Sequence, residues 1–182
     1  MRLPLHSFVG HLAAADIGAT FNFYREGGGA ARRRERLLAY LAARAESRML
    51  LVGEAAGYRG ARVSGVPFTS ERQLTGSGPG EATATIVHRV LAELGLEERV
   101  LLWNVVPTHP HVVHRPDTNR RPTRAEIEAG LPFLERLASG RRVIAVGRLA
   151  EGVLGRPAVR HPSHGGARDF RAGLVQLLDG FR

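Results

Sequence analysis

One stretch of the sequence decides the fold: Met49-Leu50-Leu51-Val52-Gly53-Glu54-Ala55-Ala56-Gly57-Tyr58-Arg59-Gly60. Its first four residues are apolar and the run ends abruptly at Gly53, which predicts a buried strand that leads into a tight turn. A continuous apolar run is typical of a parallel strand that is covered on both faces. Because ligands bind at the loops that leave the carboxyl ends of such strands, we expect the loop that holds Glu54 to form part of a functional site.

Apolar runs and helical patterns alternate along the rest of the chain. Further strands are predicted at 100–106, 142–147 and 158–160. Helices are predicted at 30–45 and 81–94, and a third begins after Thr123. A short helix follows the strand at 142–147 and ends at about Leu154, and the last helix lies at the carboxyl end. In the last helix, one face is expected to carry Phe170, Leu174, Leu177, Leu178 and Phe181. Thr123 followed by Glu126 indicates a capping box, and Pro132 predicts a kink or a restart of the helix that begins there.

This order of elements predicts one α/β domain over residues 1–182. We expect an N-terminal helical region at 1–47 and a core at 48–182, built on a central four-stranded parallel sheet with helices on both faces.

Composition indicates a nucleic-acid partner and excludes thiol chemistry. The chain has 182 residues and a net charge of +9, and all 26 of its basic Lys and Arg residues are arginines, whose planar groups bind phosphate oxygens well. It has no cysteine, so disulfides, zinc thiolate sites, iron–sulfur clusters and a cysteine nucleophile are excluded. No apolar run suits a membrane span, and His6 and His11 interrupt the first apolar run, so no signal peptide is expected. We expect a soluble, cytoplasmic monomer without membrane contact.

The candidate functional residues all follow strands. Glu54 and Phe68 come after the first predicted strand, Asn104 lies at the end of the second, and His161 and Ser163 follow the fourth. The carboxyl ends of parallel strands lie on one edge of the sheet, so these side chains can converge. A carboxylate and an aromatic ring beside arginines suggest a pocket for a base or a nucleotide.

These residues resemble the motifs of the uracil-DNA glycosylase superfamily, closest to the branch that carries GEAPG and HPS. The segment 53–57 is similar to GEAPG with alanine in place of proline, 65–68 is similar to GxPF, and 161–163 matches HPS. A further stretch of that branch is similar to residues that lie between these segments, namely Asn104-Val105-Val106, Pro110, Asn119-Arg120, Pro122 and Glu126. The resemblance runs from about Leu50 to Phe170.

The resemblance implies a monofunctional DNA glycosylase that flips uracil out of DNA and hydrolyses its N-glycosidic bond, leaving an abasic site for base excision repair. It implies no cofactor and no metal. The catalytic residues would be Glu54 and His161, and the substrate-binding residues Gly53, Ala55, Gly57, Phe68 and Asn104. The DNA-binding residues would be Arg120, Arg121, Ser163, His164, Gly165 and Gly166.

Besides the alanine at position 56, the chain departs from the family pattern at four further positions. The cysteines of the iron–sulfur members would fall at about Thr108 and Gly130, so no cluster is expected. Ala55 stands where the best-known members have a water-positioning aspartate, and Gly57 stands where they have the tyrosine that excludes thymine. Two alternatives therefore stay open: a glycosylase for another base, such as hypoxanthine or a mismatched base, and a catalytically weak nucleic-acid-binding module.

Structural roles compete with the functional ones at several residues. Glu54 would ordinarily pair with Arg59 or Arg62, and Phe68 is as well suited to the core as to base stacking. Trp103 is expected in the core. The closely spaced His109, His111 and His114 resemble a metal cluster, but we interpret them as loop residues or phosphate contacts.

Overall fold

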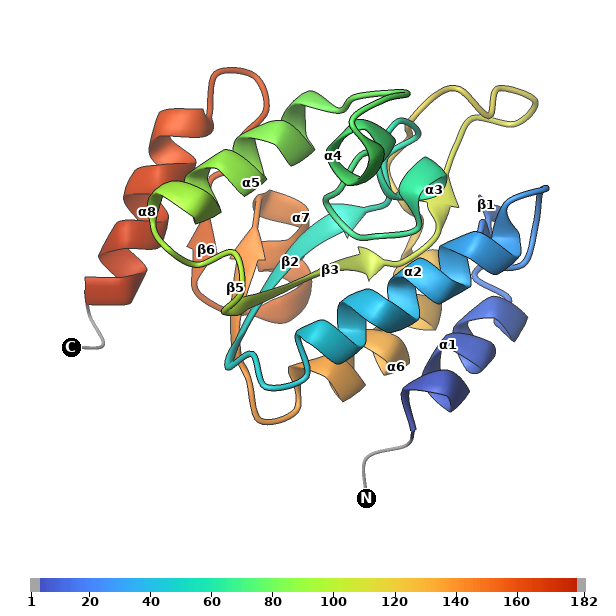
Figure 1. Ribbon diagram of the computed structural model, residues 1–182, viewed down its shortest axis with the longest axis horizontal. Coiled ribbons are helices and arrows are strands. Elements are labelled where there is room, and N and C mark those ends of the chain that lie inside the picture. Colours follow the sequence, from blue (N-terminus) through green and yellow to red (C-terminus); the bar gives the residue numbers. More distant parts are fainter. Residues whose placement is uncertain (1–3, 180–182) are drawn as a thin grey trace.

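The computed structural model describes residues 4–179 and is built around one four-stranded sheet (Figure 1). Its strands are β2 (Met49–Ala55), β3 (Val100–Val106), β5 (Arg142–Val146) and β6 (Ala158–Val159). They lie in the order β3-β2-β5-β6, and every neighbouring pair is parallel. The predicted four-stranded parallel sheet is therefore confirmed.

Helices cover both faces of the sheet, because each buried strand sends alternate side chains to opposite sides. Leu50 and Val52 pack into one apolar cluster, whereas Leu51 between them packs into the other. The first cluster is covered by α1 (Leu5–Ala14), α2 (Ala30–Ala43), α6 (Arg124–Ala138) and α7 (Arg148–Leu154). The second is covered by α5 (Ala82–Glu93) and α8 (Ala167–Asp179). Figure 1 shows α5 and α8 on one side of the sheet and α1, α2 and α6 on the other.

The N-terminal segment contains elements that the sequence pattern did not indicate. Helix α1 places Phe8 against Trp103 of β3, with ring centroids 5.8 Å apart. After it, β1 (Thr20–Phe21) pairs antiparallel with β4 (His109–Pro110). The side-chain amide of Asn22, only 1% exposed, donates to the carbonyl of Leu12 at the end of α1. These contacts join the first residues to the sheet.

The sequence predicted a kink or a restart at Pro132; helix α6 runs unbroken through this residue, so there is no restart. Proline removes one backbone hydrogen bond from a helix interior and crowds the preceding turn. The helix nevertheless begins at the predicted capping box, where the Thr123 side chain accepts from the N–H of Glu126. Beyond Pro132, Leu134 and Leu137 are buried against the sheet, and this packing offsets the local loss.

The long connection between β2 and α5 contains two short helices, α3 (Ala61–Ser64) and α4 (Glu71–Thr75). In the last helix, α8, Phe170 and Leu174 are buried as expected, while Phe181 lies outside the described residues. Within residues 4–179, no helix is both long enough and apolar enough to cross a membrane.

Candidate active site

A cavity of about 290 Å³ opens at the carboxyl edge of the sheet, and most of the predicted site residues line it, whereas Gly53, Arg121, Gly165 and Gly166 do not. It is bordered by Glu54 and Ala55 at the end of β2, Gly57 just after it, Phe68 before α4, Asn104 on β3, and His161, Ser163 and His164 after β6. The segments between these residues are long, yet the parallel topology brings their ends together. The cavity also takes in Glu81, Thr83 and Asn119, which no sequence pattern had indicated as site residues.

Gly53 allows the ring of Phe68 to lie directly against the backbone of β2. A Cβ atom at Gly53 would overlap the ring of Phe68 and would lie 3.0 Å from Oδ1 of Asn104. Gly53 and Asn104 are also register partners on β2 and β3. The missing side chain therefore sets the aromatic ring and the amide side by side.

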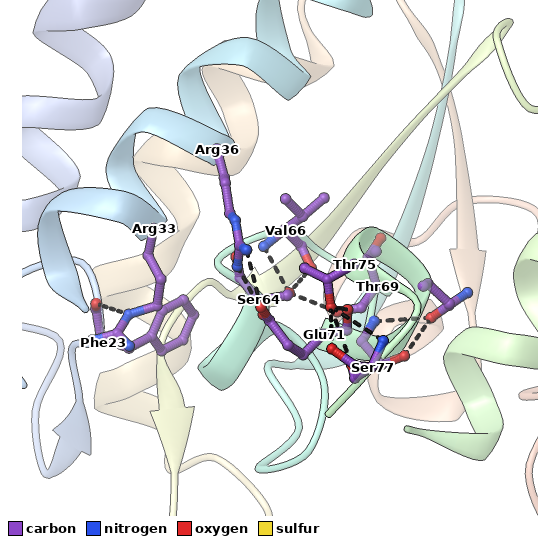
Figure 2. Close-up of polar contacts among 11 residues, drawn as sticks. Phe23, Arg33, Arg36, Ser64, Val66, Thr69, Glu71, Thr75 and Ser77 are labelled. Atoms are coloured by element: carbon purple, nitrogen blue, oxygen red, sulfur yellow. Dashed lines mark hydrogen bonds and ion pairs between the residues drawn. The ribbon is translucent and has the colours of Figure 1, made fainter. Parts of the chain in front are cut away.

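The loop that carries Phe68 is held rigidly, although Phe68 itself adopts a positive φ of 53° that is unusual for a residue with a side chain. Figure 2 shows the polar contacts that support this loop. The hydroxyl of Ser64 donates to the carbonyl of Thr69 (2.6 Å) and accepts from the N–H of Val66 (3.0 Å). This network keeps the ring at the wall of the cavity, where it is only 8% exposed.

An ion pair fixes the same loop to helix α2. Arg36 contacts both carboxylate oxygens of Glu71, at 2.7 and 2.9 Å (Figure 2). The bidentate geometry specifies orientation as well as distance. On the other side of the loop, the ring of His88 lies 3.1 Å from the hydroxyl of Thr69.

Asn104 presents a free amide to the cavity. Its side chain is 4% exposed, and among residues 4–179 no hydrogen-bond partner for the amide is found. Buried amides are almost always paired in folded proteins. An unpaired one on a cavity wall is suited to a ligand with a complementary donor and acceptor.

His161 is held with a defined pattern of protonation. The backbone N–H of Ser163 donates to its Nδ1 (3.2 Å), and the Ser163 hydroxyl lies 2.7 Å from the same atom. Because an amide N–H can only donate, Nδ1 accepts, and the neutral ring carries its proton on Nε2. Burial, with a smaller contribution from His164, lowers the pKa of His161 and favours this neutral form.

Two glycines allow the backbone to approach His161 closely. A Cβ at Gly147, at the end of β5, would lie 3.1 Å from the Cβ of His161. A Cβ at Gly166 would overlap the carbonyl of His161. Glycines at these positions let the ring sit between the end of β5 and the turn that follows β6.

Glu54 is half-buried and lines the same cavity as His161, and its carboxylate makes no ion pair or hydrogen bond within the described part of the chain. Burial raises the pKa of its carboxyl group, and the positive charge of Arg121 opposes this shift. The alternative pairing with Arg59 or Arg62 is not found, because their guanidinium groups lie over the rings of Tyr58 and Phe21 respectively. Glu54, His161 and Arg121 also line an adjoining cavity of about 330 Å³.

Glu81 is a second carboxylate at the cavity, and the motifs did not indicate it. Its oxygens occupy the space where Cβ atoms of Gly57 and Gly60 would lie. Burial raises its pKa as well. The carboxyl group of Glu81, at the start of α5, therefore forms the part of the cavity wall beside Gly57. A larger residue at position 57 would otherwise form it. The two glycines were the only hint in the sequence that another side chain fills this space.

The two predicted DNA-binding arginines differ in their surroundings. All five N–H groups of Arg120 are used: two bind the Glu126 carboxylate (2.6 and 2.8 Å), and the others bind the carbonyls of Ala19, His111 and Arg121. Arg120 is therefore committed to buried Glu126, which is 1% exposed. Arg121 is exposed at the mouth of the adjoining cavity.

Within residues 4–179 no group of three or more metal-binding side chains is found, and His109 of the three closely spaced histidines lies in β4. His109 is fully buried, and its Nδ1 lies 2.8 Å from the carbonyl of Ala56. Asn119 accepts from the N–H of Tyr58 (3.0 Å). These contacts hold the loop that follows Glu54 at the end of β2. Trp103 is completely buried, as expected.

Comparisons with known proteins identify a family and a similar fold. A family model described as the Uracil DNA glycosylase superfamily matches residues 41–175. Among solved structures, wild-type SMUG2 from Pedobacter heparinus is similar, with a TM-score of 0.73 and 12% sequence identity over 97% of each chain. At that identity the likeness concerns the fold. A search of curated proteins gives no match.

Proposed function

This chain belongs to the uracil-DNA glycosylase superfamily, a family of DNA glycosylases, and from that premise we propose that it removes uracil from DNA. In this proposal the enzyme flips uracil out of the base stack, hydrolyses its N-glycosidic bond as a monofunctional glycosylase, and leaves an abasic site. One observation carries the proposal: a hydrogen-bond donor, a free amide, a carboxylate and an aromatic ring, from His161, Asn104, Glu54 and Phe68, all line one cavity. Its volume of about 290 Å³ suits a single base.

The proposed role of His161 follows from its protonation. Cleavage of the bond between base and sugar leaves negative charge on the departing base and an oxocarbenium-like sugar. A donor that is already in position stabilises developing charge without reorganisation. The Nε2–H of His161 supplies such a donor for O2 of uracil, while Ser163 keeps Nδ1 an acceptor.

Glu54 is proposed to serve the other half of the reaction. Its carboxylate orients the attacking water or stabilises the cationic sugar, and either role requires the ionised form. Burial opposes ionisation, and the charge of Arg121 favours it. Arg121 therefore assists Glu54 in addition to its expected contact with the DNA backbone.

Asn104 and Phe68 are proposed to select the base. The amide of Asn104 can accept from N3–H and donate to O4 of uracil. Cytosine carries a bare N3 and an amino group, so both contacts would be mispaired unless the amide turned over. Leaving a buried polar group unpaired costs about 1–3 kcal/mol. The ring of Phe68 offers the flipped base a surface for stacking.

A second candidate activity, on another base, is favoured by the wall beside Gly57. There the cavity is bordered by the carboxyl group of Glu81 and not by a bulky side chain. This wall differs in chemistry from the tyrosine that excludes thymine in the best-known members, so it does not impose the same exclusion. Hypoxanthine and mismatched thymine are therefore included among the bases to be tested.

The test is excision from defined oligonucleotides in the presence of EDTA. Purified protein is incubated with strands that contain uracil, hypoxanthine, mismatched thymine or only normal bases, and alkali then cleaves any abasic site. We expect strand cleavage at uracil, and loss of that cleavage in Glu54→Gln. Cleavage at another base alone would support the second candidate. No cleavage of any strand would contradict both.

A further inference from the structure

The loop between β4 and α6, residues 111–123, carries two adjacent valines that face solvent. Val112 is 47% exposed and Val113 is 69% exposed, and they are two of the three exposed large apolar side chains in residues 4–179. Single exposed apolar residues are common on protein surfaces, whereas neighbouring ones at one loop tip indicate a contact with a partner. Figure 1 shows this loop, in yellow, projecting from the body of the domain.

The loop tip is a rigid turn. The N–H of Arg115 donates to the carbonyl of Val112 (2.8 Å). The Thr118 hydroxyl donates to the carbonyl of Arg115 (2.6 Å) and accepts from the N–H of Val112 (3.1 Å). Nε of Arg120 donates to the carbonyl of His111 (2.8 Å), at the base of the turn. These bonds present the valines outward in a fixed shape.

The turn also lies beside the candidate active site. Pro110 and Asn119, at the two ends of the turn, line the same cavity as His161. Val113 follows Pro110 by three residues, which limits the separation of their Cα atoms to about 11 Å even in a fully extended chain. The tip is therefore close to any DNA whose base occupies the cavity.

The charge around the tip fits a polyanion. Arg115 and Arg121 are exposed in this loop, and Asp117 is its one acidic residue. Two valines are far too small an area for a stable protein interface, which buries about 1,000 Å² or more. Insertion between base steps, in contrast, requires only one or two apolar side chains.

We propose that Val112 and Val113 form a wedge that enters the base stack of duplex DNA while the target base occupies the cavity. This inference rests on the proposed function, because a flipped base leaves a gap in the stack that an apolar side chain can fill. The loop after β6 is less suited to this task. Its residues Ser163 to Gly166 include no large apolar side chain.

The first test compares duplex with single-stranded DNA. In Val112→Ala/Val113→Ala, single-turnover excision of uracil from a duplex should fall by at least about tenfold, because extrusion from the stack is no longer assisted. Excision from a single strand, which has no stack to open, should stay within about twofold of the parent. Val113→Leu should keep the duplex rate, and Val175→Ala on α8 is the control for the same truncation elsewhere. An unchanged ratio of duplex to single-strand rates would overturn the wedge.

A second measurement needs no excision, so failure of the proposed function and failure of the wedge can be told apart. The protein is added to a duplex that holds a tetrahydrofuran abasic analogue next to a fluorescent 2-aminopurine. The parent should raise the fluorescence by disturbing the stack, and the double alanine variant, at saturating concentration, should not. Equal fluorescence changes with the two proteins would overturn the wedge, even if the parent released no uracil from any DNA.

Discussion

The backbone N–H of Ser163 donates to Nδ1 of His161 across 3.2 Å, and this bond determines which ring nitrogen carries the proton. A protonated Nδ1 would set two donors against each other, so the arrangement favours the neutral ring with its hydrogen on Nε2. Burial lowers the pKa of His161 and acts in the same direction. The proposed donor to the departing base is thus a neutral imidazole, and this has consequences for pH.

Excision should fall as the solution becomes acidic. The active form has His161 neutral and Glu54 ionised. The pKa of His161 is lowered from 6.5 and that of Glu54 is raised from 4.5, mainly by burial in both cases. Acidification from neutral pH therefore protonates both groups, and single-turnover rates should be highest near neutral pH and decline as the solution becomes acidic. A rate that rises on acidification would contradict the neutral donor.

Replacing Glu54 should stabilise the protein while it abolishes activity. Because the pKa of Glu54 is raised in the folded state, its ionised form costs stability at neutral pH. This cost is absent below the ordinary value of 4.5 and develops as the pH rises through that value. At pH 7 the melting temperature of Glu54→Gln should therefore be higher than that of the parent. The difference between the two melting temperatures should be smaller in acid. Glu35→Gln, on the exposed side of α2, is the control. A lower melting temperature for Glu54→Gln at pH 7 would contradict the uncompensated carboxylate.

Asn104→Asp should change the choice of base. The carboxylate loses the donor for O4 of uracil and places acceptors near it, whereas the amino group of cytosine suits a carboxylate. We expect a large loss on uracil and a weak gain on cytosine, measured by single-turnover excision from matched oligonucleotides. The control for introducing a carboxylate is Asn119→Asp. Asn119 lines the same cavity, and an aspartate there keeps an acceptor for the N–H of Tyr58. Parental rates and base preference in Asn104→Asp would show that this amide does not read the base.

The two arginines of the loop before α6 should respond differently. Arg121→Gln should weaken binding to duplex DNA and lower the slope of log affinity against log salt by about 0.9, the value for one phosphate contact. Arg120→Met should instead destabilise the fold by about 3 kcal/mol or more, because it leaves the buried Glu126 carboxylate unpaired. Salt titrations and denaturant unfolding separate the two. An unchanged slope in Arg121→Gln would show that Arg121 is a solvated surface charge without a phosphate contact.

Much of the fold was predictable, because the apolar runs of β2, β3 and β5 can only be strands buried on both faces. The parallel order then placed Glu54, Asn104 and His161 at one edge of the sheet, where the cavity lies. Helix α1 was missed because its apolar positions are mixed with small and polar residues. Its place is set by packing against Trp103, and local pattern does not show this.

The remaining site residues depend on contacts between distant segments. Glu81 reaches the cavity because Gly57 and Gly60 leave room for its carboxyl group, and a single sequence does not show which side chain fills such a space. Arg120 was predicted from the sequence to contact DNA. Its five donors are taken up by Glu126 and by three carbonyls, one of them from Ala19, which is distant in the sequence.

Single-turnover release of uracil from duplex DNA by the parent and by His161→Ala tests the central claim most directly. The parent should release uracil and leave an alkali-labile site. His161→Ala should bind the same duplex with nearly parental affinity, and its rate should fall on the order of 10²–10³, the usual effect of losing one preorganised donor. His6→Ala, on the exposed face of α1 and outside the cavity, should retain the parental rate. Rates for His161→Ala within a few fold of the parent, or no uracil release by the parent itself, would contradict the account.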